Sequence, residues 1–176
     1  MTTKVAFEIL YREYYVRVFG LCRRLLNSAS LAEDATQETF MRAFRHFATY
    51  RSTDPFWQWI ATIANNHCID LLRRRHTQGN LFGDETTEFQ QITAADSGAL
   101  TLLVDDENQR ALATAIGKLP DRYRVPLVLA YWNEASYEEI AGMLSISTSH
   151  VGVLLLRARQ QLRTSLTQAG LEVTEP

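Results

Sequence analysis

Three consecutive arginines, Arg73–Arg75, follow a group of aromatic residues, and this combination could bind a nucleic-acid strand. The aromatic residues fall within thirteen positions and are Phe47, Tyr50, Phe56, Trp57 and Trp59. Unpaired bases stack on such rings for ~1–3 kcal/mol each, and guanidinium groups bind phosphates. The same aromatic residues would also suit a buried core, and the arginines would also suit the negative end of a helix dipole. From these residues alone, both interpretations stay open.

A second candidate site lies between Tyr137 and Arg159. A short helical pattern, YEEIA, is followed by a turn pattern, Leu144-Ser145-Ile146-Ser147, and then by a longer helical pattern that runs to Arg159. This order is typical of a helix-turn-helix, whose second helix usually enters the DNA major groove. The sequence therefore predicts a role in gene regulation.

Catalytic and metal-binding patterns do not account for the chain. There is no GxxxxGK, HExxH, GxSxG or CxxC motif, and the four histidines are scattered. We expect no enzymatic activity, no metal and no cofactor. Cys22 and Cys68 are far apart in the sequence, and we interpret them as small apolar fillers in a reducing cytoplasm. No apolar run approaches the ~20 residues of a membrane span, so we expect a cytoplasmic protein without membrane insertion.

The N-terminal part has the three- and four-residue spacing of helices. We expect one helix from about Ser30, as its cap, to Phe47, with Phe40, Phe44 and Phe47 facing inward. A further helix should begin at Asp54-Pro55, as cap and first turn, and end at the three arginines. On it we expect Phe56, Trp59, Ile60 and Ile63 inside and Gln58, Thr62 and Asn65 outside.

The charge distribution divides the chain into three parts. Residues 1–75 carry 11 basic and 7 acidic side chains, residues 76–107 carry none and 7, and residues 108–176 carry 7 and 6. The middle part is rich in Gly, Thr, Gln and Asp and has no sustained periodicity, which is typical of a linker. We therefore predict an all-α protein with two small helical domains, 1–75 and 108–176, joined by a flexible acidic linker, 76–107.

Three segments in this order resemble the small bacterial sigma factors of the extracytoplasmic-function (ECF) group of the sigma-70 family. They are AEDATQETFMRAF, FWQWIATIANNHCIDLLRRR and LPDRYRVPLVLAYWNEASYEEIAGMLSIS, followed by RARQQLR. The resemblance implies a transcription initiation factor that binds core RNA polymerase and directs it to promoters. It implies a region 2-like domain before the linker and a region 4-like domain after it. Its implied partners are the polymerase β′ clamp helices and β flap, promoter DNA and an anti-sigma factor.

The resemblance also assigns residues to three sites. The polymerase-binding residues would be Asp34, Gln37, Glu38, Met41 and Phe44. The residues that recognise and open the −10 element would be Tyr50, Arg51, Trp59, Asn66, Arg73 and Arg74, with Asp70 beside them. The residues that contact the −35 element would be Ser147, Thr148, His150, Arg157 and Arg159.

The recognition helix departs from the pattern of its relatives. Gly152, Val153 and Leu154 stand where relatives commonly have a basic, a polar and a basic residue. Because Lys and Arg are the main readers of phosphate and guanine, we expect a weak or less specific −35 contact. The run Leu154–Leu156 could instead bury in a partner. Two other functions stay open: a helix-turn-helix regulator without polymerase docking, and a polymerase-binding adaptor that has lost −35 recognition.

Overall fold

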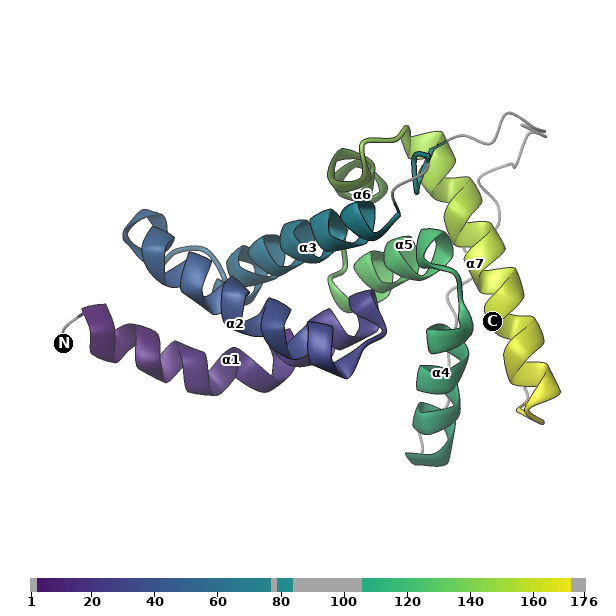
Figure 1. The fold of residues 1–176 in the computed structure, drawn as a ribbon, viewed down its shortest axis with the longest axis horizontal. Coiled ribbons are helices and arrows are strands. Elements are labelled where there is room, and N and C mark those ends of the chain that lie inside the picture. Colours follow the sequence, from purple (N-terminus) through teal and green to yellow (C-terminus); the bar gives the residue numbers. More distant parts are fainter. Residues whose placement is uncertain (1–2, 77–78, 84–105, 172–176) are drawn as a thin grey trace. The chain divides into compact units, whose positions relative to one another are not determined.

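The computed structural model describes residues 3–76, 79–83 and 106–171, and its regular elements there are all helices (Figure 1). The chain divides into two compact units, Met1–Gln78 and Gly79–Pro176. Residues 84–105, which make up most of the predicted linker, lie outside the described residues. Over the described ranges no single helix is both long and apolar enough to cross a membrane, although the bent pair α6 (Tyr137–Leu144) and α7 (Thr148–Gln168) meets that criterion together.

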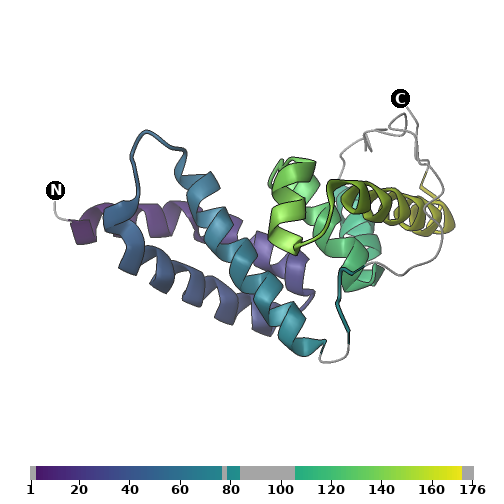
Figure 2. The ribbon, with the colours of Figure 1, turned by 90° about the horizontal axis from the view of Figure 1, so that it is seen from above.

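The first unit is a bundle of three long helices. They are α1 (Thr3–Leu26), α2 (Ala29–His46) and α3 (Phe56–Arg75), with a short 3-10 helix, η1 (Phe47–Thr49), after α2. Figure 2 shows the long loop that leads from η1 to α3. The three- and four-residue spacing of apolar residues gives each helix one apolar stripe, and each helix buries this stripe against the other two. The buried side chains include Val18 and Leu25 of α1, Phe40 of α2 and Ile60 of α3.

The start of α2 differs from the predicted start by two residues. Ser28 is the N-cap, and its side-chain oxygen accepts a hydrogen bond from the backbone N–H of Leu31. Asn27 precedes it with φ of 50°, a left-handed conformation that lets the chain turn sharply after α1. Ser30 therefore lies in the first turn of α2 and is not its cap. Both serines fit the capping pattern, and the length of the α1–α2 turn decides between them.

Two predictions about α3 also need correction. Its N-cap is Pro55, with no side-chain cap, rather than Asp54. The backbone carbonyl of Asp54 instead accepts a 2.7 Å hydrogen bond from the Tyr50 hydroxyl, which closes the preceding loop. Asn65 was expected outside but is 3% exposed. It follows Ala64 on the buried stripe, and a helical stripe more than 100° wide includes such neighbouring positions.

The second unit contains the helix-turn-helix. Its helices are α4 (Asp106–Lys118), α5 (Asp121–Trp132), α6 (Tyr137–Leu144) and α7 (Thr148–Gln168). The axes of α6 and α7 meet at 99°. Ser145 ends α6 in the left-handed conformation, and the Ser147 side chain caps α7 by accepting from the His150 N–H. This confirms the predicted helix, turn and helix.

The leucine run of α7 belongs to the core of the second unit. Leu154 and Leu155 are each 0% exposed, while Leu156 is half-buried. Leu154 and Leu155 therefore offer no surface to a partner, and the suggestion that the whole run forms a docking patch is wrong for these two. A basic residue at position 154 would have to leave the core, so an apolar side chain here fits its burial.

Candidate functional site

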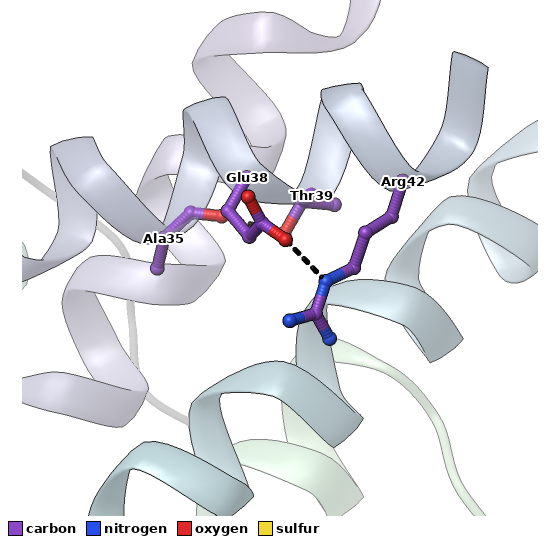
Figure 3. Close-up of polar contacts among 4 residues, drawn as sticks. All are labelled: Ala35, Glu38, Thr39 and Arg42. Atoms are coloured by element: carbon purple, nitrogen blue, oxygen red, sulfur yellow. Dashed lines mark hydrogen bonds and ion pairs between the residues drawn. The ribbon is translucent and has the colours of Figure 1, made fainter. Parts of the chain in front are cut away.

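One face of α2 presents the polar residues assigned to polymerase binding. Asp34 and Gln37 are exposed, and Glu38 is half-buried. Figure 3 shows Glu38 turned toward Arg42, whose Nε donates a 2.6 Å hydrogen bond to the Glu38 carboxylate. This hydrogen bond lowers the pKa of Glu38. The neighbouring Thr39 is buried on another side of α2, and its hydroxyl donates to the Ala35 carbonyl at 2.7 Å within the same helix (Figure 3).

An apolar groove adjoins this face, between α1 and α2. Its volume is about 630 Å³. Met41 is 51% exposed and Phe44 is 49% exposed within it. The residues that line the groove are Lys4, Phe7, Glu8, Tyr11, Gln37, Phe40, Met41, Phe44 and Arg45.

Phe44 corrects the predicted helix face. We expected its side chain to point inward, yet half of its surface is exposed. Its ring makes an edge contact with Phe7, with centroids 5.1 Å apart. Phe44 therefore forms one wall of the groove, with one side on the core and the other open to a ligand. The sequence could not show this because the exposure of Phe44 depends on how α1 packs against α2.

The residues before α3 form an aromatic cluster. Tyr50 stacks on Phe47 with centroids 5.8 Å apart and contacts Trp59 at 5.1 Å. Phe56 also touches both Tyr50 and Trp59. Tyr50 and Trp59 are half-buried, whereas Phe56 is 5% exposed. The cluster thus serves as local core and still leaves parts of Tyr50 and Trp59 at the surface.

Polar residues of α3 lie at the surface beyond this cluster. Asn66 and Arg74 are exposed, Arg73 is half-buried, and Arg51 in the preceding loop is exposed. Arg73 lies 4.0 Å from the carboxylate of Asp70, a long ion pair. Asn66, Arg73 and Arg74 therefore lie on the same helix as Trp59. Arg51 lies in the same loop as Tyr50.

His67 lies on α3 near the charged pair of α2. Burial lowers the pKa of its imidazole, and the positive charge of Arg42 lowers it further. The Glu38 and Asp70 carboxylates act in the opposite direction and raise it. Arg42 is the ion-pair partner of Glu38.

The −35 candidates on α7 differ in their surroundings. Ser147 and Thr148 are exposed at the start of the helix, and Arg157 is half-buried. Arg159 donates from Nε to the Tyr131 hydroxyl at 2.9 Å. His150 is 6% exposed, and its Nε2 lies 2.8 Å from the carbonyl oxygen of Phe82. The structure therefore brings the two hydroxyl residues to the surface, but His150 already has a partner inside the protein.

Sequence reasoning missed the contact between the two cysteines. Cys22 on α1 and Cys68 on α3 are both 0% exposed, and their thiols form a hydrogen bond. This hydrogen bond and burial raise the pKa of the Cys68 thiol. Both cysteines are free thiols in the core. Among the residues that the structure describes, no group of three or more His, Cys, Asp or Glu side chains could hold a metal ion.

Comparison with known proteins matches two regions of the chain to known families. Residues 10–77 match the family model "Sigma-70 region 2", and residues 109–162 match "Sigma-70, region 4". The chain is 32% identical over 92% of its length to the ECF RNA polymerase sigma factor SigW of Bacillus subtilis, covering 89% of that protein. It is 29% identical over 98% of its length to the RNA polymerase sigma factor YlaC of the same organism, covering 98% of it.

Solved structures share the fold. One is the sigma factor RpoE in complex with the anti-sigma factor NepR from Bartonella quintana, with a TM-score of 0.60, 19% identity and coverage of 92% of this chain and 97% of that one. Another is CnrH in complex with the cytosolic domain of CnrY, with a TM-score of 0.54, 23% identity and coverage of 96% and 91%. Taken with the two region matches and the relatives, these findings show that the chain belongs to the extracytoplasmic-function group of the sigma-70 family, the transcription initiation factors that direct RNA polymerase to promoters.

Proposed function

We propose that the first unit binds core RNA polymerase through the α1–α2 groove and the polar face of α2, and that it opens promoter DNA at the −10 element with α3. The second unit contacts the −35 element with α7. The polymerase partners are the β′ clamp helices for the first unit and the β flap for the second. The factor acts in the cytoplasm with the polymerase and needs no catalytic chemistry of its own.

The observation that carries this proposal is the exposed pairing of Met41 and Phe44 with Gln37 and Glu38 on one side of α2. Two large apolar side chains that are about half exposed form a patch where a partner helix could lay its own apolar residues. The polar residues at the rim can then fix its register through hydrogen bonds. The ion pair with Arg42 keeps the Glu38 carboxylate ionised and oriented for such a contact.

The −10 assignment rests on the aromatic cluster and the arginines that end α3. The exposed edges of Tyr50 and Trp59 can stack on bases of a separated strand. Arg73 and Arg74 can bind phosphates of the adjoining duplex. Asn66, exposed on the same helix, has both a donor and an acceptor for a base edge.

The −35 assignment is the weaker of the two. Ser147 and Thr148 are exposed at the first turn of α7, the part of a recognition helix that meets base edges. Gly152 and Val153 add no charge on the next turn. This observation also favours a second function, a polymerase-binding adaptor with little −35 recognition. Run-off transcription from promoters that contain or lack a −35 element separates the two functions.

An anti-sigma factor is a further proposed partner. The similar structure of the sigma factor RpoE was solved with the anti-sigma factor NepR bound, and that of CnrH with the cytosolic domain of CnrY bound. The apolar α1–α2 groove is a surface that a partner helix of this kind could occupy, in competition with the polymerase.

The decisive experiment combines the purified chain with core RNA polymerase and measures both binding and transcript starts. The double variant Gln37→Ala, Glu38→Lys should bind polymerase at least tenfold more weakly and should keep its helicity by circular dichroism. Val16→Asp is the matched control, because Val16 is 77% exposed on α1 and does not line the groove. Equal polymerase affinity of the folded double variant and the wild type would overturn the docking surface.

A further inference from the structure

A turn within the predicted linker is held by the second unit. Residues 80–83 form a β-turn in which the Gly83 N–H donates to the Asn80 carbonyl at 3.0 Å. Phe82 at its third position is 0% exposed. The predicted flexible linker began at residue 76, so these four residues behave as part of the helix-turn-helix unit. We call residues 80–83 the anchor turn.

The anchor turn is bound through two of its carbonyl groups. His150 on α7 donates from Nε2 to the Phe82 carbonyl at 2.8 Å, because a carbonyl can only accept. Arg122 on α5 donates from Nη2 to the Gly83 carbonyl at 3.3 Å. Two helices of the unit therefore hold consecutive residues of the turn.

The turn also requires glycine at its last position. A Cβ atom on Gly83 would lie 2.7 Å from the Cβ of Asn80, closer than real Cβ atoms come. Alanine at position 83 would therefore force the turn to shift. Its closure, the burial of Phe82 and the two captured carbonyls are separate observations, and together they describe a specific docked segment.

The position of His150 connects this segment to DNA binding. His150 is the third residue of α7, in the turn that a recognition helix places against base edges. The proton on Nε2 that bonds the Phe82 carbonyl cannot be donated to a base at the same time. The anchor turn and DNA thus compete for this side chain.

The length of chain before Phe82 adds a second consequence. Residues 76–81 can span at most ~25 Å between Arg75 and Phe82 while the turn is docked. Once residues 80–83 are released, the chain from 76 to 105 can span ~100 Å. Release of the turn therefore increases the distance that the connector can span between α3 and α4.

We propose that residues 80–83 form a latch, which holds the start of the linker on α7 in the free factor and opens when the factor spans a promoter. His150 then loses its hydrogen bond to the Phe82 carbonyl, and its Nε2–H donates to DNA instead. The latch rests on the proposed function, because it presumes that α7 faces DNA. Closed, the latch occupies the Nε2 proton of His150 and shortens the connector; open, it frees the imidazole and lengthens the connector.

Affinity for DNA tests the latch in the full-length free factor. Gly83→Ala and Phe82→Ser should each open the turn, and Gly142→Ala is the matched control, because a Cβ there meets nothing within 4 Å. The probe is a short random-sequence DNA duplex, measured by fluorescence anisotropy. If the latch is open in about 10% of wild-type molecules, opening raises the affinity about tenfold. Equal affinities for wild type and folded variants would overturn the competition.

Hydrogen exchange tests the latch without any variant. The Gly83 amide, bonded to Asn80, should exchange slowly in the free wild type and at least tenfold faster in the complex with core polymerase and promoter DNA. Slow exchange in both states would overturn the opening step, and fast exchange in both would overturn the closed latch. Run-off transcription by the wild type tests the proposed function separately. A transcribing factor whose Gly83 protection never changes has the function without the latch.

Discussion

Glu38 and Arg42, one turn apart on α2, form a 2.6 Å ion pair in the middle of the proposed polymerase surface (Figure 3). The pair is partly exposed, so its direct contribution to stability is small. Its main effect is on the carboxylate itself, whose pKa is lowered first by the hydrogen bond from Arg42. A carboxylate held ionised and in one orientation is a better partner for a docking helix than a mobile one.

The first prediction follows from this pair. Arg42→Gln should raise the pKa of Glu38 toward its ordinary value, because the charge and the main donor are lost. In the folded wild type the lowered pKa of Glu38 favours its carboxylate form. The contribution of the Glu38–Arg42 pair to folding stability is therefore present above the ordinary carboxyl pKa and is lost as the pH falls through the folded pKa. NMR titration of the Glu38 side chain measures the shift, and polymerase affinity should fall a few-fold. Arg12→Gln, which breaks the Arg12–Glu8 pair on α1, should leave the Glu38 titration unchanged.

The second prediction concerns Gly152 on α7. A Cβ here would meet only Tyr137, at 3.7 Å, so a longer side chain can be accommodated. Gly152→Lys should strengthen DNA binding and steepen its salt dependence by up to ~0.9 units of log–log slope for one added phosphate contact. It should also raise stability by ~0.5 kcal/mol or more through helix propensity. Anisotropy titrations over a range of salt concentrations measure the slope.

Gly142→Lys is the control for the added charge. Gly142 is exposed on α6, and a Cβ there meets no atom within 4 Å, so a lysine can also be accommodated at this position. The same charge on the same unit, but off α7, should change the slope less. Equal slopes for the two lysine variants would mean that the effect comes from net charge and that position 152 does not face the duplex.

The sequence predicted the all-helical fold, the two units, α2, α3, the helix-turn-helix and most of the solvent-exposed polar face of α2, because each depends on local spacing. What it could not predict depends on contacts between distant segments. Cys22 and Cys68 meet only because α1 packs on α3, and nothing in their spacing indicates this. The exposure of Phe44 depends on how α1 packs against α2. His150 has a suitable type and position for DNA, yet its partner is a linker carbonyl 68 residues away.

The third prediction tests the leucine core of α7. Leu154→Ala should destabilise the second unit by ~2–5 kcal/mol, because a fully buried side chain is lost and a cavity remains. Leu156→Ala, at a half-buried position two residues further, should cost less. Urea unfolding followed by circular dichroism gives both values. If Leu154→Ala is no more destabilising than Leu156→Ala, then position 154 is not the core position that its burial indicates.

The fourth prediction concerns strand opening by Asn66. This residue is exposed on α3, so Asn66→Ala should leave the unfolding free energy nearly unchanged. Permanganate reactivity of promoter thymines should fall several-fold, while formation of the closed complex changes less. The ratio of the two readouts is what matters. A parallel loss of both would assign Asn66 to initial binding, and no loss of either would remove it from the −10 site.

The last prediction separates the two roles of Tyr50. Its hydroxyl closes the loop by donating to the Asp54 carbonyl at 2.7 Å, and its ring stacks on Phe47 and contacts Trp59. Tyr50→Phe removes only the hydrogen bond and should cost ~1 kcal/mol or less, because the bond is solvent-exposed. Tyr50→Ala also removes the ring, which would deprive a separated strand of a stacking partner worth ~1–3 kcal/mol. Strand opening should therefore fall slightly in the first variant and at least fivefold in the second.

Tyr14→Phe on α1, where the ring contacts Phe56 at 5.0 Å outside the loop, is the control. Equal losses for Tyr50→Phe and Tyr50→Ala would show that the hydroxyl, through the shape of the loop, does the work assigned here to the ring.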